Sequence, residues 1–222
     1  ASNTLTFAPG DTEKTIDISI LGDLADENSE EYYVNLTGPD NATISDAQGI
    51  GTIVDDDIPE VSISGGASVT EGNVGTTTGA FTISLDNPST KIVIVNYATA
   101  GSTAESDIDF YSDSGTLTFA PGDTSKTVNI DIIGEELDED NETFSVGLTS
   151  PSNSIIGTFQ ADCTIIDDDT SGISITAGAP VTEGNSGSTS GSFTVSLNNP
   201  STKIVTVNYA TADDSAAAGT DY

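Results

Sequence analysis

The sequence contains no histidine, arginine, tryptophan or methionine, and only one cysteine. Its 222 residues carry 36 acidic side chains against 4 lysines, which gives a formal net charge of −32. Nucleic acids and anionic membranes are bound through basic patches, so this composition argues against both as partners. The single cysteine, Cys163, excludes a disulfide within the chain and is expected to be a small side chain of a strand.

Long apolar runs are also missing. No stretch predicts a membrane span or a signal peptide, although a signal could have been removed or could lie upstream in a longer chain. The excess of acidic residues predicts that the protein attracts cations and repels itself without them. Such charge can indicate disorder, but the regular strand patterns described next argue against it.

The chain repeats itself with a period of 112 residues and no insertion or deletion. "TLTFAPGDT" stands at 4–12 and 116–124, "NPSTKIV" at 87–93 and 199–205, and "VNYATA" at 95–100 and 207–212. This self-similarity predicts one complete domain over residues 58–169. It also predicts a C-terminal half of a repeat over 1–57 and an N-terminal half over 170–222. We call these three parts the central repeat, the head half and the tail half.

Within the central repeat, seven short segments alternate apolar and polar residues or run apolar, and they are rich in Val, Ile, Thr, Phe and Tyr. Clusters of Gly, Pro, Asn and Asp separate them. The pattern predicts an all-β protein built of immunoglobulin-like, seven-strand β-sandwiches. The predicted strands span residues 61–64, 80–85, 91–99, 115–119, 125–133, 142–148 and 157–166.

Neither flanking half can bury its apolar face alone. A neighbouring chain could complete them by joining tail half to head half in an open filament. The adjacent repeats of a longer tandem array could also complete them, or the chain could close on itself. Closure is the least favoured, because the halves leave the central repeat from opposite ends. An accidental cut is the remaining explanation.

The acidic residues are concentrated at one end of the predicted sandwich. Six of the eight residues from Glu135 to Glu142 are acidic, and they lie between two predicted strands. Antiparallel connectivity brings this loop together with Glu71, with the acids around Asp109 and with the run at 167–169. A solvated acidic face would explain one such run, but four converging runs favour a bound cation, because clustered carboxylates repel or take up protons. Ligands that are all oxygen favour Ca²⁺ over Mg²⁺ and argue against zinc or copper.

Several motifs together resemble the Calx-beta repeat: "VTEGN" (69–73), "VNYATA", "GTDY" (219–222), the segment 115–148 and the closing "IIDDD" (165–169). The resemblance covers the whole chain and implies a seven-strand sandwich that in some members binds calcium at this acidic end. By position, it implicates Glu71, Asp109, Glu135, the carbonyl of Leu137, Glu139, Glu142, Asp167, Asp168 and Asp169. Gly134 stands where exchanger-type domains begin an acidic run, which implies one ligand fewer.

The flanking halves would share the equivalent ligands between them. The resemblance places Glu183 and Asp221 in the tail half. In the head half it places Asp23, the carbonyl of Ala25, Glu27, Glu30, Asp55, Asp56 and Asp57. Joining of the halves would then bring calcium across the join and make assembly calcium-dependent.

These features predict a calcium-binding structural or adhesive repeat of an extracellular microbial surface protein or filament. Because "DDDTSGISI" places the last ligands just before the next repeat, calcium is expected to stiffen the inter-repeat junctions. The expected partner is a second repeat joined head to tail, with a surface or glycan ligand as a further candidate. The alternative is a calcium-sensing regulatory module like that of sodium–calcium exchangers. Catalysis is not expected, because no nucleophile–base pair accompanies the carboxylates.

Overall fold

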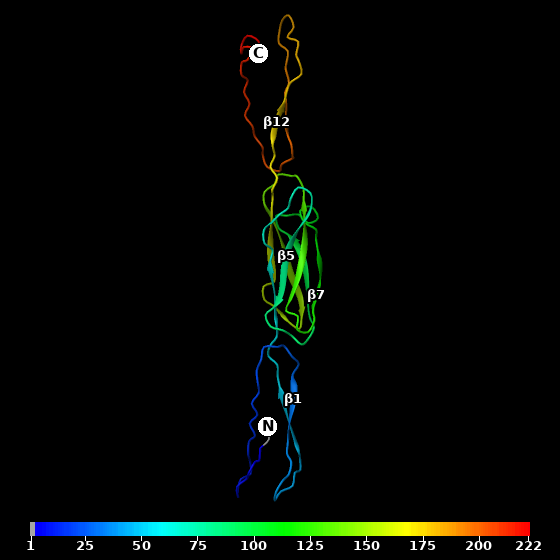
Figure 1. Ribbon diagram of the computed structural model, residues 1–222, viewed down its shortest axis with the longest axis vertical. Coiled ribbons are helices and arrows are strands. Elements are labelled where there is room, and N and C mark those ends of the chain that lie inside the picture. The colour runs from blue at the N-terminus through cyan, green and yellow to red at the C-terminus, as the bar shows by residue number, and fades with distance from the viewer. Residues whose placement is uncertain (1–2) are drawn as a thin grey trace.

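A computed structural model describes residues 3–222, and this part of the chain is all-β. The molecule is a rod with the central repeat in the middle, the head half at one end and the tail half at the other (Figure 1). The prediction of an all-β protein built from sandwich repeats is therefore confirmed. The relative positions of the three parts decide which acidic residues can meet.

The central repeat is a sandwich of two sheets. The first sheet has the order β10-β3-β5-β8 and the second the order β4-β11-β9-β6-β7. Seven of these strands match the seven predicted segments, and β4 and β10 are two-residue additions that pair in parallel with β11 and β3. The strands are β3 (Glu60–Gly65), β4 (Val69–Thr70), β5 (Gly75–Leu85), β6 (Val93–Gly101), β7 (Ser114–Phe119), β8 (Ser125–Gly134), β9 (Glu142–Ser152), β10 (Ile155–Ile156) and β11 (Gln160–Ile166).

The chain changes sheets directly after the first predicted strand. The strand β3, which matches the predicted segment 61–64, lies in one sheet, and β4, which was not predicted, lies in the other. Gly65 and Gly66 make the crossing, with φ of 104° and 69°. A Cβ on Gly66 would lie 2.1 Å from the carbonyl oxygen of Asp162, so no other residue fits this close approach.

Alternating side chains of the two sheets form the core. Phe144 of β9 stacks on Phe110 with ring centroids 4.4 Å apart, and it meets Phe81 edge to face with ring centroids 6.0 Å apart. All three rings are fully buried. Cys163 of β11 is buried among them, and burial raises the pKa of its thiol. The core thereby fixes the ends of β4, β8, β9 and β11, where the acidic loops begin.

Each half-repeat holds one strand pair. In the head half β1 (Glu30–Asn35) pairs with β2 (Gln48–Ile53), and in the tail half β12 (Ile173–Thr176) pairs with β13 (Thr194–Leu197). Residues 3–25 and 204–222 are extended or in turns and join no strand within the described chain. Their equivalents in the central repeat are β7, β8 and β6, which pair there with strands of the other half of the repeat.

Candidate metal centre

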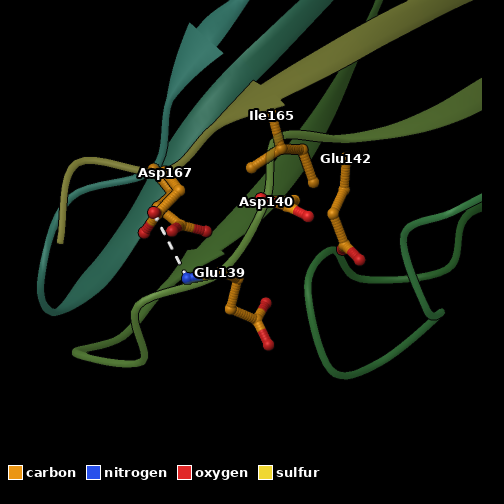
Figure 2. A pocket seen from close by; sticks show the side chains of 6 residues that line it. Glu139, Asp140, Glu142, Ile165 and Asp167 are labelled. Carbon is orange, nitrogen blue, oxygen red and sulfur yellow. Dashed lines mark hydrogen bonds between the residues drawn. The ribbon is translucent and has the colours of Figure 1, made fainter. Parts of the chain in front are cut away.

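Four connections of the central repeat meet at one end of the sandwich, which we call the acidic pole. Glu71 follows β4 and Asp109 lies in the loop between β6 and β7. Glu139 lies in the loop between β8 and β9, Glu142 is the first residue of β9, and residues 167–169 follow β11. The convergence predicted from antiparallel connectivity is present. Figure 2 shows Glu139, Glu142 and Asp167 around a small pocket, with the Glu139 amide donating to Asp167.

The carboxylates form two groups that could each hold a metal ion. Within each group, one oxygen of every member lies within 4.8 Å of the others. The first group is Glu71, Asp167 and Asp169, and the second is Asp109, Glu139 and Glu142. Glu71, Asp109 and Asp169 are only 5, 8 and 6% exposed, so these are buried acids rather than a solvated face. Six of the predicted ligands are thus brought together.

Backbone amides hold several of these carboxylates in place. The amide of Glu105 donates to Asp109 Oδ2 at 2.6 Å, and the amide of Glu139 donates to Asp167 Oδ2 at 3.2 Å. The side chain of Asn73 donates to Asp169 Oδ1 at 2.5 Å. These hydrogen bonds order the loops around the carboxylates without a cation, which lowers the entropic cost of binding one.

The pKa values show the electrostatic cost of this crowding. Burial, followed by the charges of Glu135 and Asp167, raises the pKa of Glu71 to about 8. Burial, followed by a hydrogen bond with Asp109, raises the pKa of Glu142 to about 8. Burial and neighbouring carboxylates also raise the pKa values of Glu135, Glu139 and Asp169. A divalent cation would remove this cost by neutralising the group.

Two buried carboxylate oxygens lack a hydrogen-bond partner among the described residues: Glu135 Oε1 and Asp169 Oδ2. A buried acceptor without a partner is costly, and a cation would satisfy it. The donor set is oxygen only, which suits a hard cation such as Ca²⁺. The residues present therefore fit the cation that the sequence predicts.

The remaining candidates of the central repeat lie beside the two groups. Glu135 accepts a hydrogen bond from the Leu137 amide at 2.8 Å, and its negative charge raises the pKa of Glu71. Asp168 accepts from the amide of Gly72 at 3.0 Å, so it holds the loop after β4. Gly134 has no room for an acidic side chain, because a Cβ there would lie 2.2 Å from the carbonyl oxygen of Gly72.

The candidates of the flanking halves are not brought together within one chain. Glu183 and Asp221 lie in the tail half, and the others lie in the head half at the opposite end of the rod (Figure 1). The loops nevertheless repeat the contacts of the central pole. The backbone amide of Ala25 donates to Asp23, that of Glu27 donates to Asp55 Oδ2 at 3.1 Å, and that of Ala217 donates to Asp221 Oδ2 at 2.9 Å. Glu30 begins β1, and Asp56 and Asp57 continue the run of Asp55, where burial and neighbouring carboxylates raise the pKa of Asp57.

Comparison with known proteins assigns the chain to one family. The family model of the Calx-beta domain matches residues 1–63, 54–169 and 167–222. The chain belongs to the Calx-beta family. Sodium/calcium exchanger 2 of Rattus norvegicus and the same exchanger of Homo sapiens are each 31% identical over 96 residues. The match covers 36% of this chain and 10% of each exchanger, so the chain corresponds to a small part of those proteins.

Solved structures similar to this Calx-beta chain include the apo form of the Calx CBD1 domain. It is 25% identical, with a TM-score of 0.42, and the match covers 50% of this chain and 99% of that one. The CBD12 structure from CALX1.2 is also 25% identical, with a TM-score of 0.45 and coverage of 50% and 44%. Separately, residues 3–222 contain no helix with the length and apolar character needed to cross a membrane.

A contact that was not predicted from the sequence joins one Calx-beta repeat to the next. Asp138 belongs to the acidic loop, but it points into the "NPSTK" turn of the tail half. Its amide donates to the Pro200 carbonyl at 3.1 Å, and its carbonyl accepts from the Thr202 amide at 3.0 Å. Its carboxylate lies 2.6 Å from Lys203 Nζ. We call this set of bonds the junction contact.

The junction contact occurs twice, 112 residues apart. Asp26 of the head half bonds the Pro88 carbonyl at 3.0 Å and the Thr90 amide at 2.8 Å, and its carboxylate lies 2.5 Å from Lys91 Nζ. Asp26 is 2% exposed and also accepts from the Ser89 hydroxyl. The signal in the sequence was the exact recurrence of the lysine in "NPSTK" in a chain with only 4 lysines.

Proposed function

We propose that the acidic pole of each complete repeat binds calcium and that the chain is a calcium-responsive module of the Calx-beta family. The observation that carries this proposal is the pair of carboxylate groups, each of which has oxygens within 4.8 Å of one another. Each group also contains one glutamate, Glu71 or Glu142, whose pKa is raised to about 8. Such groups are costly without a cation and stabilised with one.

The chemistry of the donors supports calcium. Ca²⁺ accepts about six to eight oxygen ligands in flexible geometry, whereas Mg²⁺ needs a tighter octahedron and retains water. Glu71, Asp167 and Asp169 would hold one ion, and Asp109, Glu139 and Glu142 a second. The orphaned oxygens of Glu135 and Asp169 would provide further ligands. The ion would supply the positive charge that allows all these groups to ionise.

The relatives favour a regulatory module over the extracellular scaffold that the sequence alone predicts. Sodium/calcium exchanger 2 of Rattus norvegicus and of Homo sapiens are among the similar proteins. Asp169 is followed within four residues by Ile173, the first residue of β12, so a change at the pole has a short path to the next repeat. Binding of calcium at the acidic pole would thus change the junction with the next repeat.

A structural repeat of an extracellular microbial surface protein is the second candidate. Two junction contacts with the same residues, 112 positions apart, support it, because identical junctions give an array a constant geometry. Under this candidate, calcium would stiffen the rod rather than report a signal. A surface or glycan partner would belong to this candidate.

Thermal unfolding tests calcium binding, which both candidate functions require. The protein is unfolded in a chelator, in about 5 mM Ca²⁺ and in the same concentration of Mg²⁺. Calcium at about 1,000 times its dissociation constant would stabilise the repeat by about 4 kcal/mol per site. A rise in Tm specific to calcium is expected. An equal rise with magnesium or with salt alone would contradict the proposal.

Calcium titration followed by small-angle X-ray scattering separates the two candidates. A regulatory module is expected to change shape as the ion binds at micromolar concentrations. A structural repeat is expected to bind at about 0.1–1 mM, as extracellular modules do, and to keep its rod shape.

A further inference from the structure

The chain enters the central repeat at one end of the sandwich and leaves it at the other. Pro59 stands just before β3, and Asp169 follows β11 at the acidic pole. The family model also matches residues 1–63 and 167–222, so the chain runs on into another repeat on both sides. The three parts lie end to end along the rod (Figure 1). Tension along the rod is therefore applied to the central repeat between its first and its last strands.

The first and the last strands of the central repeat run side by side in the same direction. β3 pairs in parallel with β10, with Glu60 opposite Ile155, and β4 pairs in parallel with β11, with Val69 opposite Ile165. Tension pulls β3 and β4 towards the head half and β11 towards the tail half, so it slides parallel neighbours past each other. The hydrogen bonds between them run across the strands, and sliding loads them all at once. Pulling two strands apart sideways would instead break such bonds one after another.

The pairing of β4 with β11 continues into the acidic pole. Three successive residues of the loop after β4 donate hydrogen bonds to the end of β11 and to the residues that follow it. The bonds run from the Glu71 amide to the Ile166 carbonyl at 3.2 Å, from the Gly72 amide to Asp168 Oδ1 at 3.0 Å and from the Asn73 side chain to Asp169 Oδ1 at 2.5 Å. These bonds join the same two strands, so they also resist sliding.

The first carboxylate group spans these two strands as well. Glu71 follows β4, whereas Asp167 and Asp169 follow β11. Asp169 is 6% exposed, and its Oδ2 has no hydrogen-bond partner among the described residues. The second carboxylate group contains no residue of the segments that tension slides. An ion held by the first group would therefore bridge the strands that tension separates.

We propose that the central repeat has a mechanical function. The parallel pairing of β3 and β4 with β10 and β11 resists tension along the rod, and an ion in the first carboxylate group reinforces it. The hydrogen-bonded part needs no ion. The reinforcement rests on the proposed calcium binding, so the two parts can fail separately.

Single-molecule force spectroscopy in two pulling directions tests the hydrogen-bonded part. The variant Thr82→Cys/Ser125→Cys in a Cys163→Ala background is pulled, in a chelator, either by its two termini or by handles on the two new cysteines. Thr82 and Ser125 are exposed on the neighbouring strands β5 and β8, so the second direction parts these strands sideways. Under terminal load, unfolding of residues 58–169 is recognised because it releases roughly 370–400 Å of chain, less the length of the folded repeat.

Terminal load is expected to require the higher unfolding force. The free energy of unfolding is the same in both measurements, because the protein is the same. A difference in force therefore reports the barrier along each direction, which governs forced unfolding. Equal forces in the two directions, or a higher force in the sideways direction, would overturn the proposal.

Saturating Ca²⁺ tests the reinforcement. The unfolding force is expected to rise under terminal load and to change little under sideways load. Under terminal load, Asp169→Asn should lose most of this rise, whereas Glu136→Gln, which removes an exposed charge, should keep it. A rise of the same size in both directions, or one that Asp169→Asn leaves intact, would overturn the bridging role even if calcium raises the Tm. If calcium fails to raise the Tm, the proposed binding fails, while the dependence on direction in chelator still supports the hydrogen-bonded part.

Discussion

Lys203 of the tail half extends to the acidic pole of the central repeat, where its ammonium lies 2.6 Å from Asp138 and 3.3 Å from Asp167. The hydrogen bond to Asp138 raises the pKa of Lys203 and lowers the pKa of Asp138. One lysine thus connects the residue that docks the next repeat with a carboxylate of the candidate metal site. Lys91 has the same relation to Asp26 and Asp55 at the other junction, at 2.5 and 3.8 Å.

Asp26→Ala is expected to loosen the junction between the head half and the central repeat. The substitution removes a charge-assisted hydrogen bond to Lys91 and leaves the Ser89 hydroxyl without its acceptor, which costs about 1–3 kcal/mol of docking free energy. The amide of Thr90 donates to the Asp26 carbonyl across the junction, so its hydrogen exchange should accelerate. Residue-resolved exchange by NMR measures this directly.

The control for this variant is Asp11→Ala, which breaks the exposed ion pair to Lys14 at 2.7 Å in a turn remote from the junction. Exposed pairs of this kind contribute little. Exchange at Thr90 should be unchanged. Equal acceleration in both variants would show that the head half unfolds rather than undocks.

Much of the central repeat could be predicted from the sequence. The alternation in β5 places Phe81, Ile83 and Leu85 in the core, and all three are buried. Antiparallel connectivity alone predicts that Glu71 and Asp167 share one end of the sandwich. Both predictions depend on local periodicity and on chain direction, which a sequence contains.

The sequence could not predict features that depend on how separate parts approach one another. The change of sheet at Gly65 and Gly66 depends on the carbonyl of Asp162, a residue almost a hundred positions away. The role of Asp138 depends on where the turn of the next repeat lies. The sequence shows Asp138 only as one of six acidic residues in its loop. In the structure, it is the residue of this loop that binds the turn of the next repeat.

The metal-free protein is expected to lose stability as the pH rises from about 5 to about 8.5. Glu71 and Glu142 have folded-state pKa values of about 8 against an ordinary 4.5. A group whose pKa is raised by folding contributes stability that is complete below its unfolded pKa and is lost as the pH passes its folded pKa. Urea unfolding in a chelator at a series of pH values measures the slope.

Saturating calcium should remove this slope, because the ion holds the same carboxylates in their ionised form. Binding near pH 7 should then release about one proton per carboxylate group, which calorimetry in two buffers of different ionisation enthalpy detects. Asp26 and Asp138 have lowered pKa values, so the stability that they contribute is lost in a separate range, as the pH falls below about 4. A metal-free stability that increases between pH 5 and 8.5 would contradict the assignment.

Glu142→Gln is expected to change stability in opposite directions with and without calcium. Without the ion it removes a buried charge next to Asp109 and Glu139, so the variant should be more stable than the natural chain above about pH 8. With the ion it removes a ligand, and affinity should fall roughly 10–100-fold. Glu136→Gln, on the exposed side of the same loop, should do neither. Equal behaviour of the two variants would mean that net charge, not the group, is responsible.

Phe119 and Phe7 occupy the same position of the repeated segment "TLTFAPGDT" in different surroundings. Phe119 is 1% exposed and Phe7 is 52% exposed. Phe119→Ala is expected to cost the central repeat about 3–5 kcal/mol of unfolding free energy, because it leaves a cavity in a packed core. Phe7→Ala should have little effect on the dilute single chain, since its side chain contacts solvent.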